Sequence, residues 1–328
     1  MNLNLNQPNL ALEKRIKGFK GFLEKREAGA LLGLIIMCVA ISFISDFFFT
    51  FSNLINIARQ VSLNAIIAVG MTLVILTGGI DLSVGSIVAL SGTVAASLMV
   101  NGHNPWIGIL AGLVIGIVIG LINGLTITRF KVPPIITTLA MMTAARGIAL
   151  VYTNGYPISN LPDSFVFLGR GYLGPIPVPA IIMIVVYILG YILLTQMKVG
   201  RYIYGLGGNE EAVHLSGINV NRTKILVYVL CGLASAISGL ILASRLNSGQ
   251  PLAGTGFEMD AIAAVVLGGA SISGGEGTIV GTLIGALIIN VLNNGLNLMN
   301  VNPYSQMIVK GLVLAAAVAI RTRKGKNK

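Results

Sequence analysis

Four asparagines lie close together in one apolar stretch near the carboxyl end of the chain: Asn290, Asn293, Asn294 and Asn297. Their spacing of i, i+3, i+4 and i+7 places them on one face of a helix. Amides in an apolar segment must find hydrogen-bond partners. Two interpretations stay open, because the amides could bond to neighbouring helices or line a polar path for a hydroxyl-rich solute. We take Asn293, Asn294 and Asn297 as candidate path-lining residues.

A carboxylate, Asp81, also lies within an apolar stretch. The glycines around it indicate an unwound or kinked joint between two helices. Ionisable groups at membrane depth are costly and are often functional. A structural ion pair with a residue such as Arg146 is an equally good interpretation. Asp81 and Ser83 therefore join the path-lining candidates, with the structural alternative open.

The polar segment at residues 198–224 lies between two long apolar stretches and predicts a short capped helix. Asn209 is a suitable N-cap, and Glu210 and Glu211 fall in the first turn, where carboxylates favour the helix dipole. Gly217 is expected to end the helix after about two turns. The segment is either a solvated loop between helices or a site to which another protein binds.

Several kinds of chemistry find no support in the chain. It contains no G-x-x-x-x-G-K-[ST] phosphate loop, no H-E-x-x-H zinc motif and no nucleophile elbow. Its two histidines are isolated, and its two cysteines lie inside apolar stretches. The dense relay of Asp, Glu and His found in many proton-coupled carriers is also missing. We therefore expect no catalytic residue, no metal site and no ATP site in this chain.

Composition indicates a polytopic membrane protein. Of its 328 residues 55% are hydrophobic and only 10% are charged, whereas soluble domains carry about 25% charged residues. The net charge of +11 does not indicate nucleic-acid binding, because the basic residues crowd the chain ends and a few loops, as they do when facing anionic lipid. No cleavable signal peptide is evident, since the first 27 residues are polar and basic.

Ten apolar stretches are long enough to be candidate transmembrane helices. They span residues 28–48, 54–77, 84–100, 106–127, 134–152, 178–197, 224–244, 257–273, 278–298 and 304–321. The eighth is expected to be short, broken or re-entrant, because acidic residues begin it and glycines crowd its end. With a cytoplasmic amino terminus, 17 of the 22 basic residues fall on the same side, as the positive-inside rule requires. Both termini and residues 198–224 are therefore predicted to be cytoplasmic.

Glycines recur in two regular patterns. Between residues 108 and 124 every fourth residue is glycine, which forms one ridge where a neighbouring helix can approach closely. We expect this ridge to serve packing rather than ligand binding. In addition, residues 78–85 are similar to residues 268–275, and each copy precedes an apolar stretch. Internal repeats with broken helices are common in transporters.

Several motifs, in the same order, resemble the permease subunits of monosaccharide ABC importers, and the ribose-type branch in particular. They lie at residues 76–86, 131–134, 154–155, 207–212, 215–219, 253–256, 261–269 and 293–297. The resemblance covers nearly the whole chain after about residue 28. The motifs identify the family better than they identify the sugar, because permeases for xylose, arabinose, galactose or allose are similar in sequence.

The resemblance implies an all-α polytopic fold of the type II, vitamin B12 importer-like architecture, in the bacterial cytoplasmic membrane. It divides the chain into a basic extension (1–27), a permease domain (28–321) and a basic tail (322–328). The implied partners are a second copy of the chain, an extracytoplasmic sugar-binding protein and an ABC ATPase that uses ATP and Mg²⁺. The implied ATPase-coupling residues are Gly208, Asn209, Glu210, Glu211, Ala212, Leu215, Gly217 and Ile218.

The function expected from this resemblance is ATP-driven import of a monosaccharide, most naturally ribose, by alternating access. A stand-alone secondary carrier or channel for a polar solute is the alternative from another class. A purely structural membrane scaffold is a third. The coupling-like segment and the missing proton relay favour the importer permease.

Overall fold

The computed structural model describes residues 26–326. The basic extension expected at residues 1–27 lies almost entirely outside the described residues, and the tail at 322–328 lies partly outside them. Within the described part, helices make up nearly all of the regular structure. They are α2 (Arg26–Ile44), α3 (Phe51–Leu76), α4 (Val84–Val100), α5 (Pro105–Arg129), α6 (Pro134–Thr153), α7 (Asp163–Arg170), α8 (Val178–Thr195), α9 (Lys198–Gly208), α10 (Glu210–Leu215), α11 (Val220–Leu246), α12 (Phe257–Leu267), α13 (Ile279–Leu298) and α14 (Pro303–Lys326).

Seven of the described helices are long and apolar enough to cross a membrane: α2, α3, α5, α6, α8, α11 and α13. Helix α4 is a shorter apolar helix of 17 residues. The expectation of an all-α polytopic membrane protein is therefore confirmed. Each of the ten predicted stretches overlaps a helix, but α12, in the eighth, has only 11 residues.

Several of the long helices begin or end at capping residues. The Asn104 side chain accepts a hydrogen bond from the Trp106 amide at 2.9 Å, and Pro105 follows at the first helical position of α5. At the carboxyl ends of α6 and α11, Asn154 and Asn247 adopt left-handed backbone conformations that terminate these helices. These local signals set the lengths of the helices before any packing is considered.

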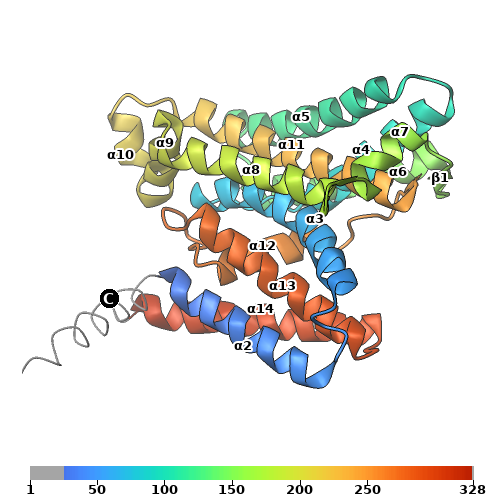
Figure 1. Ribbon diagram of the computed structural model, residues 1–328. Helices are drawn as coiled ribbons and strands as arrows, with labels where there is room; N and C mark the ends of the chain where they lie inside the picture. The colour runs from blue at the N-terminus through green and yellow to red at the C-terminus, as the bar shows by residue number, and fades with distance from the viewer. Residues whose placement is uncertain (1–25, 327–328) are drawn as a thin grey trace, which may run out of the picture.

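Helix α11 packs against α3, α4 and α5, and Figure 1 shows it alongside α5. The predicted glycine ridge of α5 makes this possible. A Cβ atom on Gly120 or on Gly124 would lie 2.8 Å from a backbone Cα atom of α11. The ridge thus serves close packing, as the four-residue spacing predicted.

Two short strand pairs complete the regular structure of the described residues. Strand β1 (Ile158–Ser159) pairs with β4 (Ser248–Gly249), and β2 (Tyr172–Leu173) pairs with β3 (Ile176–Pro177). Figure 1 shows β1 and α7 at one end of the bundle and α9 and α10 at the opposite end. After β4 the chain passes through turns at residues 251–256 before α12 begins, and turns and bends follow α12 within residues 268–275. The eighth stretch is thus short and broken, as predicted.

Candidate functional site

Helix α10 stands exposed at one end of the bundle (Figure 1), and none of its residues is buried. The Asn209 side chain accepts a hydrogen bond from the Ala212 amide at 2.9 Å, which caps the first turn. Gly217 ends the helix with a φ of 78°, a conformation that favours glycine. The local prediction of a short capped helix is therefore confirmed.

The two glutamates of α10 have different surroundings. Both carboxylate oxygens of Glu210 accept from the Lys224 ammonium group at 2.7 Å, which ties α10 to the first turns of α11. Within the described residues, Glu211 is exposed and makes no ion pair. Leu215 is 79% exposed on the same short helix. The free surface therefore presents one carboxylate and one large apolar side chain, beside a surface hollow lined by Glu210, Glu211, His214, Gly217, Ile218, Asn219, Val220 and Asn221.

Helix α9 joins α10 to the rest of the bundle at the two glycine-rich repeats. The Tyr204 hydroxyl donates to the Gly277 carbonyl at 2.8 Å, and burial raises the pKa of Tyr204, so the phenol stays a neutral donor. Gly207 lies so close to Leu76 and Gly275 that a Cβ atom there would overlap their backbones. The Gly275 amide in turn donates to the Leu76 carbonyl at 3.0 Å. Helix α9 therefore connects α10 to the end of α3 and to the turn between α12 and α13.

Asp81 is fully buried and bonds to its own turn. One of its carboxylate oxygens accepts from the Ser83 amide at 2.9 Å and from the Ser83 hydroxyl at 2.6 Å. The Asn123 amide of α5 donates to the Ser83 hydroxyl at 2.9 Å. Arg146 donates instead to backbone carbonyls, so the alternative of an Asp81–Arg146 ion pair is wrong. Asp81 and Ser83 fix the start of α4, and their role in a path stays a prediction.

The asparagine face of α13 is used largely for contacts between helices. Asn294 and Asn53 of α3 exchange two hydrogen bonds, at 2.8 and 3.0 Å. Asn297 is exposed and accepts from Gln306 at 2.8 Å. Asn293 is half-buried, and its side-chain oxygen has no partner among the described residues. Asn294 therefore follows the first interpretation of this face, bonding between helices. The second interpretation, that the face lines a path, stays a prediction.

Comparison with known proteins gives the chain its family. A family model described as "Branched-chain amino acid transport system / permease component" matches residues 53–318, which is more than half of the chain. The chain belongs to this permease family. It is a multi-pass membrane transport component rather than an enzyme.

Individual relatives match the permease over nearly its full length. It is 52% identical over 314 residues to the ribose import permease protein RbsC of Bacillus subtilis (strain 168), with 95% of this chain and 97% of the relative covered. It is 51% identical over 302 residues to the protein of the same name from Escherichia coli (strain K12), covering 91% and 94%. Identity falls to 39% over 300 residues for the L-arabinose transport system permease protein AraH of that strain, covering 92% of each. No solved structure matches the permease.

The permease does not bring its two groups of path-lining candidates together. Asn294 contacts Asn53 near the start of α3, whereas Asp81 follows the end of the same helix. A helix of 26 residues is about 39 Å long. The two groups therefore lie toward opposite ends of the bundle.

Sequence reasoning missed the groups that connect these elements. Tyr204, Gly207 and Lys224 lie within the polar segment, but nothing in their spacing identifies their partners on α3, on α10 or after α12. It also missed the partner of Lys310, which donates to Asp260 at 3.1 Å. The sequence did contain a signal for this ion pair. Asp260 lies near the start of one apolar stretch and Lys310 lies within another, and charged residues in such places need partners.

Proposed function

We propose that this chain is the membrane-spanning permease subunit of an ATP-driven importer that carries a monosaccharide, ribose in particular, across the cytoplasmic membrane. The two RbsC relatives above match it at 51–52% identity, against 39% for the arabinose relative, and this difference supports ribose. The working unit is a homodimer of the type II architecture, with ten spans in each copy and both termini in the cytoplasm. An extracytoplasmic sugar-binding protein delivers the sugar.

The observation that carries the proposal is the exposed, capped α10 joined through α9 to the bundle. In the importer the coupling residues Gly208 to Ile218 dock in a cleft of the ATPase, which uses ATP and Mg²⁺, while no cofactor binds to this chain. Because Glu210 is already paired with Lys224, the docking contacts fall to Glu211 and Leu215. The cleft therefore needs a basic group and an apolar pocket.

The transport cycle follows from this connection. Closure of the ATPase on ATP moves α10, and α9 passes the movement to the end of α3 and to the turn between α12 and α13. The path then changes from outward-facing to inward-facing. Asp81, Ser83, Asn293, Asn294 and Asn297 are the proposed path-lining side chains, near its two ends. The permease binds sugar weakly, because tight binding belongs to the sugar-binding protein.

The proposal is tested in proteoliposomes that contain the permease and its ATPase, with binding protein and ribose on the outer side. Uptake should require ATP, and Glu211→Lys should lower it at least tenfold, while the neutral Glu211→Gln retains most of it. Membrane insertion and the ATPase activity of the isolated partner should not change. Uptake by this chain alone, driven by an ion gradient, would instead establish the secondary carrier. Unaltered uptake by Glu211→Lys would exclude α10 as the coupling site.

A further inference from the structure

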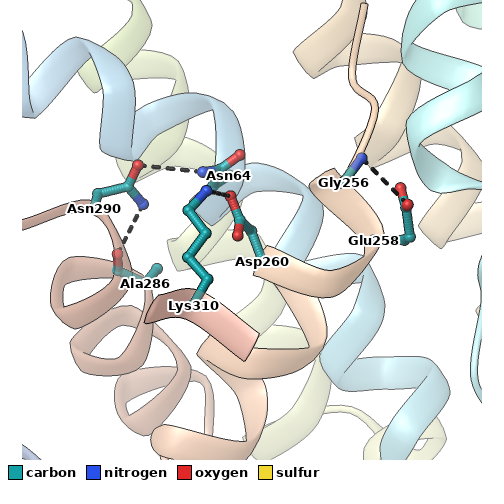
Figure 2. Close-up of polar contacts among 7 residues, drawn as sticks. All are labelled: Asn64, Gly256, Glu258, Asp260, Ala286, Asn290 and Lys310. Atoms are coloured by element: carbon teal, nitrogen blue, oxygen red, sulfur yellow. Dashed lines mark hydrogen bonds and ion pairs between the residues drawn. The ribbon is translucent and has the colours of Figure 1, made fainter. Parts of the chain in front are cut away.

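Two polar pairs from four helices lie near the start of α12, which packs against α3, α13 and α14. They are Asn64 of α3, Asp260 of α12, Asn290 of α13 and Lys310 of α14, and we call them the mid-bundle polar cluster. Two interactions hold it: Lys310 donates to Asp260 at 3.1 Å, and the Asn64 amide donates to Asn290 at 3.2 Å. Figure 2 shows the ends of both pairs directed toward the same region at the first turn of α12.

The cluster lies at mid-depth in the bundle. Asn64 is near the middle of α3, which has 26 residues, and Asn290 is near the middle of α13, which has 20. Both helices are long enough to cross a membrane, so their middles lie far from water. Charged and amide groups are costly at that depth unless they serve a polar path or one another.

The backbone beside the cluster is irregular. Gly254 and Gly256 adopt left-handed conformations with φ of 69° and 86°, and α12 begins directly after them. Arg146 donates to the carbonyls of Pro251 and Ala253 at 2.8 and 2.7 Å, which holds this turn in place. Non-helical backbone at membrane depth is tolerated where it is buried in protein or lines a cavity. Broken helices of this kind form the midplane solute sites of many transporters.

The cluster retains hydrogen-bonding capacity that its internal contacts do not use. Asn64 is 7% exposed, and its side-chain oxygen has no partner among the described residues. Among the described residues, one of the three N–H groups of the Lys310 ammonium donates to Asp260. The Lys310 side chain is 31% exposed, whereas that of Asp260 is only 9% exposed, so the cluster opens to the surface on the α14 side. A buried acceptor without a partner is costly, so a purely structural pair does not account for it.

We propose that the mid-bundle polar cluster is a transient binding site for the hydroxyl groups of the solute, half-way along its path. The Asn64 oxygen accepts from one hydroxyl, and the spare N–H groups of Lys310 donate to another. A neutral polyhydroxylated solute such as a monosaccharide fits this arrangement, since it needs donors and acceptors together. The inference rests on the proposed function and adds a solute site that differs from the path-lining candidates above.

The first test compares Asn64→Leu with Thr72→Val in the complete importer reconstituted in proteoliposomes. Thr72 is a matched control, because it also lies on α3 and bonds to α13, through Thr282 at 2.7 Å. Asn64→Leu should lower the maximal rate of ATP-driven ribose uptake at least tenfold, and Thr72→Val should change it less than twofold. The binding-protein concentration for half-maximal uptake should be the same in both. Equal uptake rates in the two variants would overturn the inference.

The second test exchanges the two charges in one double variant, Asp260→Lys with Lys310→Asp, and compares it with each single variant. If the pair is only structural, the exchange restores thermal stability and uptake together relative to the single variants, and the inference fails. If the pair binds solute, the exchange restores stability, while uptake stays at least tenfold below that of the unaltered importer. Uptake by the unaltered importer is measured first. Absence of ATP-dependent ribose uptake there would overturn the proposed function, and this inference with it.

Discussion

Gly207→Ala tests the connection between α9 and the two glycine-rich turns. A Cβ atom at this position would lie 2.8 Å from the Gly274 carbonyl carbon, and closer still to Leu76 and Gly275, where ordinary contact begins at 3.4 Å. All of these are backbone atoms, so no side chain can rotate away. Overpacking of this kind costs about 1–3 kcal/mol. Gly208 is the matched control, since a Cβ atom there meets nothing within 4 Å.

Thermal denaturation in detergent measures the cost. With a loss of about 2 kcal/mol, the midpoint of Gly207→Ala should fall by roughly 3 °C. Gly208→Ala should match the unaltered protein or exceed it slightly, because alanine favours the helix. In the reconstituted importer, Gly207→Ala should also lower the amount of sugar taken up per ATP hydrolysed, since the route from α10 to α3 is displaced. Equal midpoints for the two variants, with uptake per ATP unchanged in Gly207→Ala, would refute the reasoning.

The remaining predictions concern other contacts of the bundle. A double-mutant cycle of Asn53→Ala and Asn294→Ala should give a coupling energy of about 1 kcal/mol in thermal denaturation, because two interhelical hydrogen bonds are lost together; a value near zero would mean that the amides do not bond. Lys224→Met should cost no more than about 1 kcal/mol of unfolding free energy, since its partner on α10 is 53% exposed; a loss of several kcal/mol would contradict this. Gly116→Ala should destabilise by about 1–3 kcal/mol through overlap with α11, whereas Gly147→Ala, which faces open space, should not. Similar denaturation midpoints for these two variants would argue against the glycine ridge as a packing surface.

Much of the fold follows from local properties of the chain. Hydropathy placed the long helices, because a membrane helix must satisfy its backbone internally and cover itself with apolar side chains. Asn209 and Gly217 bounded α10, because capping and left-handed backbone depend on neighbouring residues only. The four-residue glycine spacing likewise predicted a packing ridge on α5. The eighth stretch was expected to be short or broken because of its glycines and acids, and α12 has 11 residues.

The partners of the polar groups could not be obtained in the same way. An asparagine at membrane depth needs a partner, but its helical position does not say whether that partner is another helix or a solute. Tertiary contacts decided that Asn294 bonds to Asn53. They also decided that Arg146 bonds to the turn before α12 and not to Asp81. They also separated Glu210, which is paired with Lys224, from Glu211, which makes no ion pair among the described residues. By itself the sequence determined which residues are polar within the membrane, since composition and periodicity are local. Only the tertiary structure decided which of them meet, because each contact joins residues distant in the chain.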